Sequence, residues 1–351
     1  MSARTMPERA PGRAASERRV GAGGRRLADA FEEVGRMPAL AESRRRMLGA
    51  CGGGSSGEIV GAVESDVALA IAVIRAAREA GERPSPVASV REAVERLGSK
   101  RAGSAAARVA TYDPFAGSTV AAARQEQFRR HAAATRSAAD RIAELAGLDS
   151  RDELAAAALL HDVGHQVLSE VHGDVDWSDA TAPEERVRRE RRRFGIDHAV
   201  VGGVLARRWG LRSSAAAAIE RHHASDARGH AAAIRLADLV VHYASGDGVP
   251  AVALVDAARA LRLEPDRVAA LAYEFPAING ARRSSAEPCP LSVREMDALR
   301  GLAEGKVYKQ IAHELSLSVS TIRTHLHNVY RKIGAVDRAQ AVLIARDRGW
   351  L

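Results

Sequence analysis

Apolar residues recur at the spacing of an amphipathic helix along most of the chain. The stretch from Leu27 to about Gly98 shows this period clearly, because apolar residues fall on one helical face and polar residues cover the other. The residues of the apolar face are Ile59, Val60, Val63, Val67, Ala70, Ile71 and Ile74. The period stops at Pro84-Ser85-Pro86 and resumes from Val90 to Leu97, which predicts a short helix that ends at Gly98.

The same period predicts further helices at residues 119–146, 152–170, 184–193, 197–208, 213–223 and 231–244, and shorter ones at 252–262 and 265–274. Glu184–Arg193 is almost entirely charged, and this composition indicates a solvated surface helix rather than a binding site. Aromatic residues make up only 4% of the chain, and no alternating β-branched run occurs. Packing of small residues between helices must therefore bury the apolar side chains, and the predicted fold is all-α.

The length of 351 residues is sufficient for two domains, each with its own hydrophobic core. A polar run from Asn279 to Ser285, followed by Pro288 and Pro290, marks the boundary between them. Residues 1–27 are rich in Arg, Gly, Ala and Ser and lack a hydrophobic period, so we expect a disordered basic tail there. The expected divisions are this tail, a helical bundle at 28–275, a linker at 276–287 and a smaller domain at 288–351.

The net charge of +8 favours contact with a polyanion, although charge alone does not identify a nucleic-acid-binding protein. No segment approaches the roughly 20 apolar residues of a membrane span, and the N-terminus lacks the apolar region of a signal peptide. We therefore expect a cytoplasmic protein that does not interact with membranes. Cys51 and Cys289 lie far apart and outside any Cys-x-x-Cys pair, so reduced thiols are expected.

Nine of the twelve histidines lie between His131 and His242. Aspartates accompany them, because His161 directly precedes Asp162 and Asp238 lies in the helix that ends this stretch. Imidazole and carboxylate groups from separate helices build metal sites inside helical bundles, so a divalent ion is one interpretation of this pattern. A hydrogen-bonded polar network in the core is the other.

The order of an isolated His, a His-Asp pair and a distal Asp resembles the HD superfamily of metal-dependent phosphohydrolases. The segments GRMPALAESRRRML, VESDVALAIAVIRAA, VREAVERLGS, HDVGH, GIDHAVVGGVLARRWGL and IERHH follow one another as in its HDOD branch, over about Arg36 to Glu274. The resemblance implies a divalent metal (Fe, Mn, Zn or Mg), with a nucleotide or other small molecule as a further ligand. The implied metal ligands are His131, His161, Asp162 and Asp238, with His198, His222 and His223 at a second position, as in the related HD-GYP group.

Two departures from the HD-GYP pattern bear on activity. That group has a lysine after His-Asp-x-Gly, where this chain has His165, and ASDARGHAAA follows His222-His223 in place of Gly-Tyr-Pro. Hydrolysis of cyclic dinucleotides is therefore not expected, and metal ligands alone do not make a catalytic site. Sensing is the favoured role, and a metal-dependent phosphohydrolase acting on a nucleotide or phosphate ester is the alternative.

The C-terminal residues have the pattern of a compact four-helix domain. Ser292 and Glu295 form a capping-box pattern, and Gly305 ends the helix that they begin. Further helices are predicted at Tyr308–Leu315, Val319–Lys332 and Arg338–Arg348. Short helices, a tight turn and a cationic third helix match a helix-turn-helix, whose recognition helix enters the DNA major groove. The outward residues of the third helix are Arg323, Thr324, His327, Asn328 and Arg331.

The string LSVREMDALRGLAEGKVYKQIAHELSLSVSTIRTHLHNVYRKIGAVDRAQAV resembles the LuxR-type DNA-binding domain from end to end. The resemblance implies double-stranded DNA as a partner and a homodimer made by the last helix. It places Arg323, Thr324 and His327 at base edges, and Lys309, Thr321 and Lys332 at phosphates. The expected protein is thus a transcription regulator with an HDOD bundle that senses a metal or a small-molecule signal.

Overall fold

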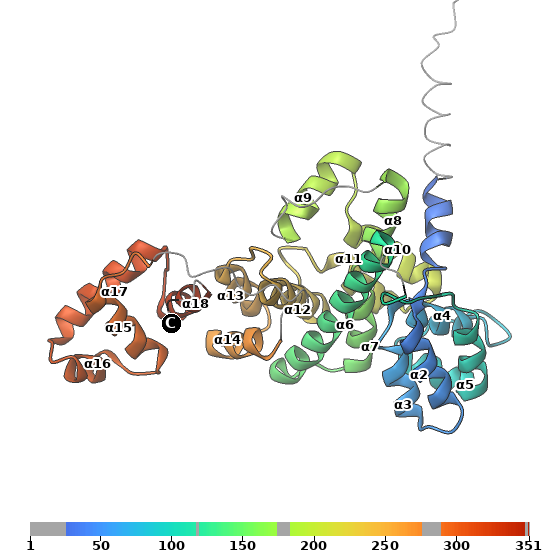
Figure 1. The fold of residues 1–351 in the computed structure, drawn as a ribbon, viewed down its shortest axis with the longest axis horizontal. Helices are drawn as coiled ribbons and strands as arrows, with labels where there is room; N and C mark the ends of the chain where they lie inside the picture. The colour runs from blue at the N-terminus through green and yellow to red at the C-terminus, as the bar shows by residue number, and fades with distance from the viewer. Residues whose placement is uncertain (1–25, 117–118, 174–182, 276–288, 348–349, 351) are drawn as a thin grey trace, which may run out of the picture.

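The computed structural model describes residues 26–116, 119–173, 183–275, 289–347 and 350. Helices dominate these ranges, so the prediction of an all-α fold is confirmed. Figure 1 shows a larger helical bundle at residues 26–275 and a smaller helical domain at 289–347. Residues 1–25 of the expected tail and the whole expected linker lie outside the described residues. Among the helices described, none combines the length and the apolar character needed to cross a membrane.

The first part of the bundle contains a helical segment at residues 26–34 and four further helices, several of whose limits follow from local sequence signals. Ser55 and Glu58 form a reciprocal capping box at the second of these four, and the Asp66 side chain caps the third. Two short strands, β1 (Ala39–Leu40) and β2 (Thr111–Tyr112), pair in parallel. The helices are α2 (Ala41–Cys51), α3 (Ser56–Val63), α4 (Val67–Arg78) and α5 (Val90–Ala107).

Two helices have limits that differ from the predicted ones. The helix that begins at Val90 does break at Gly98, where φ is 67°, but helical structure continues beyond this kink to Ala107. The single helix predicted at 152–170 is wrong, because α7 (Arg151–Leu160) and α8 (Val163–His172) are separate helices. Apolar residues continue across the break between them, so the hydrophobic period did not reveal it.

The second part of the bundle surrounds a pair of long helices. In this pair α6 (Val120–Ala146) lies along α12 (Gly229–Ser245). Alanines fill much of the core, in agreement with the predicted packing of small residues. Gly164 on α8 approaches α10 so closely that a Cβ would collide with the carbonyl oxygen of His198. The other helices are α9 (Pro183–Phe194), α10 (His198–Trp209), α11 (Ser213–Arg221), α13 (Ala251–Arg259) and α14 (Pro265–Glu274).

Residues 289–347 form a four-helix domain with its own core. The predicted capping box of Ser292 and Glu295 is present. The apolar face of the third helix is buried through Ile322, Leu326, Val329 and Ile333. The helices are α15 (Val293–Ala303), α16 (Tyr308–Glu314), α17 (Val319–Ile333) and α18 (Arg338–Asp347).

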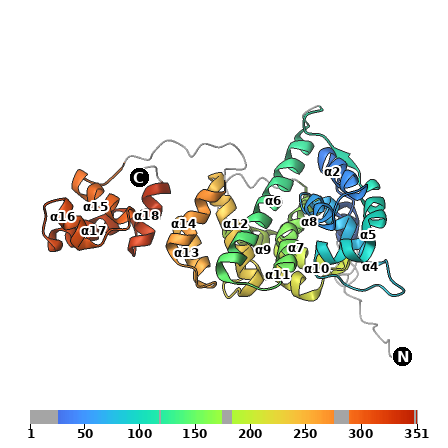
Figure 2. The same cartoon turned by 90° about the horizontal axis from the view of Figure 1, so that it is seen from below.

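The last helix, α18, contributes to the cores of both domains. Ala341 and Ala345 are buried within the C-terminal domain. Leu343 is only 3% exposed and belongs to the core of the bundle. Figure 2 shows α18 next to α13 and α14, against which it packs. A helix that lies beyond the linker in sequence is thus docked on the bundle.

Candidate metal centre and nucleic-acid interface

Several helices bring buried histidines and aspartates to one place in the bundle. His131 comes from the middle of α6, and His161-Asp162 occupies the break between α7 and α8. His198 opens α10, His222-His223 follows α11, and Asp238 lies on α12. The structure therefore places all the predicted metal ligands in two adjoining groups.

The first group consists of His131, His161, Asp162 and Asp238, whose candidate ligand atoms lie within 4.8 Å of one another. His131 Nε2 lies 3.3 Å from His161 Nε2, 3.4 Å from Asp162 Oδ2 and 3.2 Å from Asp238 Oδ1. Asp238 is 2% exposed, and His161 is fully buried. Imidazoles and carboxylates at these distances make a set suited to one divalent ion.

The second group consists of His198, His222 and His223, again with candidate ligand atoms within 4.8 Å of one another. His198 Nε2 lies 3.1 Å from His223 Nε2 and 3.3 Å from Asp162 Oδ1. The other oxygen of Asp162 faces His131 in the first group. The carboxylate of Asp162 thus lies between the two groups and can serve both.

Hydrogen bonds on the outer side of the rings orient the histidines. His161 Nδ1 lies 2.8 Å from the carbonyl oxygen of Ala158, and His222 Nδ1 lies 2.6 Å from that of Ile219. A ring nitrogen that donates to a carbonyl carries the proton, so Nε2 keeps its lone pair. Ligating histidines are commonly held in this way.

Four side chains of the cluster have ionisation states that favour metal binding. Burial raises the pKa of Asp162 and of Asp238, but neighbouring histidines outweigh burial and hold both pKa values well below the usual range. Burial and the adjacent His161 and His198 lower the pKa of His222 to about 3, and burial with His222 also lowers the pKa of His223. Ionised carboxylates and neutral imidazoles are the forms that bind divalent metals. At His131 and His198 burial lowers the pKa, but nearby carboxylates outweigh burial and raise it, so an ion must displace a proton from these two rings.

Buried atoms without hydrogen-bond partners indicate that the cluster does not satisfy itself. His222 Nε2 and His223 Nδ1 are both buried and have no hydrogen-bond partner among the described residues. An unsatisfied buried polar atom is unfavourable, and a divalent ion can accept several lone pairs at once. The side chains present therefore fit a divalent metal.

Glu190 on α9 is fully buried beside the cluster, which corrects the prediction of a merely solvated helix at Glu184–Arg193. Its carboxylate lies 2.7 Å from His198 Nδ1 and accepts a hydrogen bond from the His198 backbone N–H at 2.9 Å. Burial raises the pKa of Glu190, but two neighbouring histidines outweigh burial and lower it. Val187, also buried, shares a helical face with Glu190, and this i, i+3 spacing was the available sequence signal.

His242 is a second residue of the centre that the sequence did not single out. Its Nε2 lies 3.2 Å from Asp238 Oδ1, and its Nδ1 lies 2.8 Å from an Asp247 oxygen. Burial lowers the pKa of His242, but the two carboxylates outweigh burial and raise it to about 9. A protonated His242 thus holds Asp238 in place, and the i, i+4 spacing of the two on α12 was the signal for it.

The predicted base-reading residues are accessible on the outer face of α17. Arg323, Thr324 and His327 are exposed, and so is Arg331 further along the helix. The Asn328 side chain accepts a hydrogen bond from Arg331 at 3.1 Å. An accessible cationic helix that follows a short helix and a turn is the geometry of a recognition helix.

The predicted phosphate-binding residues are placed less uniformly. Lys309 on α16 is exposed. Thr321 shares a hydrogen bond of 2.8 Å with the Ser318 hydroxyl at the start of α17. Lys332 Nζ lies 2.7 Å from Glu295 Oε2, an ion pair inside the domain that the sequence did not predict. Lys332 would have to share or leave this pair to hold a phosphate.

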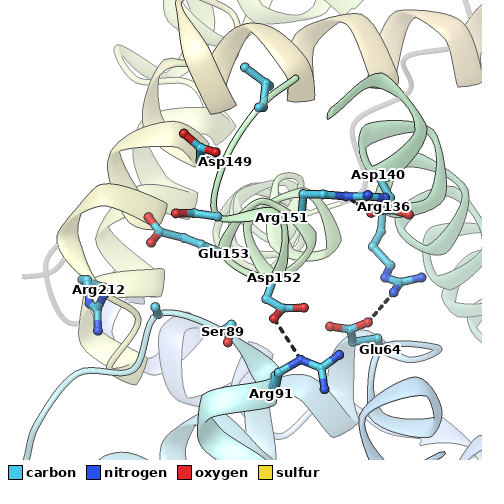
Figure 3. Close-up of a pocket in the computed structure, with 13 residues that line it drawn as sticks. Glu64, Ser89, Arg91, Arg136, Asp140, Asp149, Arg151, Asp152, Glu153 and Arg212 are labelled. Carbon is cyan, nitrogen blue, oxygen red and sulfur yellow. Dashed lines mark hydrogen bonds and ion pairs between the residues drawn. The ribbon is translucent and has the colours of Figure 1, made fainter. Parts of the chain in front are cut away.

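A cleft of about 690 Å³ lies between the two parts of the bundle, and none of the predicted metal ligands lines it (Figure 3). Ion pairs cross the cleft: Arg91 with Asp152 at 2.9 Å, and Arg136 with Glu64. These pairs join α5 to α7 and α6 to the end of α3. Paired charges of this kind hold the two parts of the bundle together.

Known families account for both domains. A model of the HDOD domain matches residues 37–225, more than half of the chain, and a model described as bacterial regulatory proteins of the luxR family matches residues 289–345. The chain thus joins a helical bundle to a helix-turn-helix domain. The chain belongs to the HDOD family, and its C-terminal domain is of the LuxR type, so both resemblances seen in the sequence are confirmed.

Relatives and solved structures agree with this division. YvfU of Bacillus subtilis, an uncharacterized transcriptional regulatory protein, is 42% identical over 62 residues, which are 18% of this chain and 31% of that protein. LiaR of the same organism is 40% identical over 55 residues, or 16% and 26%. The chain thus matches about a third or less of these relatives' length.

The crystal structure of the MmoQ response regulator of Methylococcus capsulatus covers 67% of this chain and 97% of its own, with a TM-score of 0.51 and 21% identity. A virulence factor of Campylobacter jejuni covers 72% and 90%, with a TM-score of 0.50 and 16% identity. At these identities the similarity shows the fold alone.

Proposed function

We propose that this protein is a sequence-specific transcription regulator that binds DNA through α16 and α17 and senses a divalent metal ion in its HDOD bundle. The LuxR-type domain, and relatives that are transcriptional regulatory proteins, support DNA binding. The observation that carries the sensory role is the convergence of buried, unpaired imidazole atoms on two ionised carboxylates.

In this proposal the two groups hold one ion each. His131, His161, Asp162 and Asp238 hold the first, and His198, His222 and His223 hold the second with the help of Asp162. A bound ion supplies positive charge that compensates the buried carboxylates and accepts the imidazole lone pairs. Glu190 and His242 orient the ligands from behind, as outer carboxylates and histidines do in other metal centres.

The route from the metal centre to the DNA-binding domain is short. Asp238 lies on α12, and α12 packs against α13 and α14. These same two helices hold α18 through Leu343. A shift of α12 on metal binding would therefore alter the docking of α18. In the docked state α18 lies on the bundle, and in the released state it does not. The ion can change DNA affinity only as far as it binds these two states with different affinity, and such coupling free energies are typically about 1–3 kcal/mol.

Release of α18 would also free this helix to pair with a second copy, so we propose a homodimer as the DNA-binding form. A dimeric helix-turn-helix protein reads two half-sites about one helical turn apart. A footprint on a DNA site selected from random sequences should show two related half-sites. A single protected half-site would contradict the dimer.

The test is a DNA-binding titration of the full-length protein, stripped of metal by a chelator and then supplied with Zn²⁺. The affinity for the selected site should change by roughly 5–150-fold. Leu343→Ala weakens docking and should make the affinity nearly independent of Zn²⁺. Val336→Ala, at a position that is 77% exposed in the same domain, should respond like the wild type. Equal affinity of the wild type with and without the ion would contradict metal sensing.

A further inference from the structure

His165 stands where the HD-GYP pattern has a lysine, and the proposed function gives it no role. It lies in the first turn of α8, next to His198 at the start of α10. Gly164 permits this approach, because a Cβ there would collide with the carbonyl oxygen of His198. The two imidazole rings are stacked, with centroids 3.8 Å apart and planes inclined by 17°.

The buried Glu190 holds both rings in the same orientation. His165 Nδ1 lies 3.0 Å from Glu190 Oε1, and His198 Nδ1 lies 2.7 Å from Glu190 Oε2. The His198 contact is a hydrogen bond, which leaves His198 Nε2 free to act as a ligand, whereas the His165 contact with Oε1 is an ion-pair contact that does not meet hydrogen-bond geometry. Because the rings are nearly parallel and share one carboxylate, both Nε2 atoms lie on the side away from Glu190.

That side is the second metal group. His198 Nε2 lies 3.3 Å from Asp162 Oδ1 and 3.1 Å from His223 Nε2. Within the part of the chain that the structure describes, His165 Nε2 is buried and has no hydrogen-bond partner. Candidate ligand atoms of Asp162, His165 and His198 lie within 4.8 Å of one another. A buried lone pair of this kind, in a group with ligand atoms of Asp162 and His198, is in the place of a further metal ligand.

We propose that His165 is an additional protein ligand of the second ion and closes the coordination position at which a hydrolytic centre would bind water. This role presupposes the metal binding proposed above. His165 would then join His198 and Asp162 on one side of the ion, and His198 also belongs to the triad with His222 and His223. Catalytic zinc sites keep a position for water, whereas structural zinc sites are filled by protein ligands. The ion is then the signal and not a catalyst.

An imidazole-rich set also selects the kind of ion. Imidazole suits Zn²⁺, Cu²⁺, Ni²⁺ and Fe²⁺, whereas Mg²⁺ and Mn²⁺ prefer carboxylate, carbonyl and water oxygens. The second position should therefore bind Zn²⁺, or Co²⁺ as its spectroscopic substitute, in the presence of a large excess of Mg²⁺.

The direct test replaces the imidazole with a ligand that has a distinct optical signature. A thiolate bound to Co²⁺ absorbs in the near ultraviolet through charge transfer, and imidazole ligands do not. His165→Cys should show this band when Co²⁺ fills the second position. His172→Cys places a thiol at an exposed position on the same helix and should show no band above the wild type. Because the signal is a gain, it does not depend on a loss of folding.

Equilibrium dialysis with Zn²⁺ gives a second readout. The wild type should bind two ions, and His165→Ala should bind the second at least about tenfold more weakly while the first is unchanged. Free imidazole, which matches the side chain removed, should restore the second ion. His172→Ala should bind both ions like the wild type.

The outcomes separate the two levels of the proposal. A wild-type protein that binds no Zn²⁺ would overturn the proposed function and this role of His165 together. Two ions in the wild type, with unchanged affinities in His165→Ala and no band in His165→Cys, would overturn the role of His165 alone. Sustained hydrolysis of bis(p-nitrophenyl) phosphate by the zinc-loaded wild type would overturn the closed position.

Discussion

The bundle and the C-terminal domain present their functional side chains in opposite ways. In the bundle His161 and His222 are fully buried and Asp238 is 2% exposed, whereas Arg323 and His327 on α17 face the solvent. A buried polar group must find its partners inside the protein, but an exposed one is satisfied by water until a ligand replaces it. We therefore expect function and folding stability to be coupled in the bundle and separable in the C-terminal domain.

The largest effect should come from Asp162→Ala, which removes the carboxylate between the two metal groups. An ion that binds only the native state stabilises it by about 2.7 kcal/mol at a concentration of 100 times Kd. The variant should lose most bound Zn²⁺ and the rise in melting temperature that Zn²⁺ gives the wild type, as followed by circular dichroism. Asp256→Ala, at a half-exposed aspartate on α13, should keep both. Full zinc occupancy in Asp162→Ala would disprove the shared ligand.

The next effect is a pH dependence of the metal-free protein that is specific to the bundle. The pKa of His242 is raised to about 9 from 6.5, so the folded state binds this proton more tightly than the unfolded state. The resulting stabilisation is fully present below about pH 6.5 and is lost as the pH rises through 9. His242→Gln should therefore flatten the fall in the free energy of unfolding over this range, measured by urea unfolding. The same change at His313, which is exposed in the other domain, should leave the slope as it is.

On the exposed side, Arg323→Ala should reduce specific DNA affinity by about 1–3 kcal/mol and relax the sequence preference at one base position. Thermal stability should stay within about 0.5 kcal/mol of the wild type, because the side chain is exposed and no structural contact depends on it. Binding to the selected site and to single-base variants measures the preference. A loss of equal size on every sequence would assign Arg323 to a phosphate instead of a base.

The smallest effect is expected for Lys332→Ala. A phosphate contact contributes about equally to binding of all DNA sequences. Its loss should reduce the slope of log K against log salt concentration by about one unit. The ion pair with Glu295 competes for the same ammonium group, so the loss of affinity should stay below about 1 kcal/mol. Glu295→Gln, which frees Lys332 but keeps a capping side chain, should strengthen binding slightly. If Lys332→Ala changed sequence preference, the phosphate role would be wrong.

The hydrophobic period predicted most of the helices. The family resemblance predicted which histidines and aspartates form the two groups of candidate metal ligands. The limits of most helices can be read from the hydrophobic period. The His-Asp pair and the recognition helix can be recognised because they belong to motifs whose residues follow one another in a fixed order. The break at His161-Asp162 escaped this reasoning, because Leu160 and Val163 continue the apolar pattern while the backbone turns. Where the hydrophobic period is uninterrupted, only tertiary packing decides that a helix ends.

The residues that were missed are those whose role depends on a partner far away in sequence. Glu190 lies in a run of arginines, and the charged composition of this segment predicts an exposed side chain. Its carboxylate is nevertheless buried next to His165 and His198. Lys332 and Glu295 likewise lie on different helices, α17 and α15, and their ion pair forms only once these helices pack together. Composition describes a segment as a whole, whereas burial is a property of one side chain in the folded chain.

The docking of α18 has a consequence for how regulation depends on the amount of protein. Leu343 meets α13 and α14 as part of the same chain, so the contact forms at an effective concentration on the order of millimolar, as for other short tethers. The connection within one chain therefore favours this contact over the same contact between separate molecules. A second copy or a DNA site must compete against that local concentration. If α18 also pairs with a second copy, as proposed above, the docked form would prevail while the protein is scarce, and its abundance would influence DNA binding.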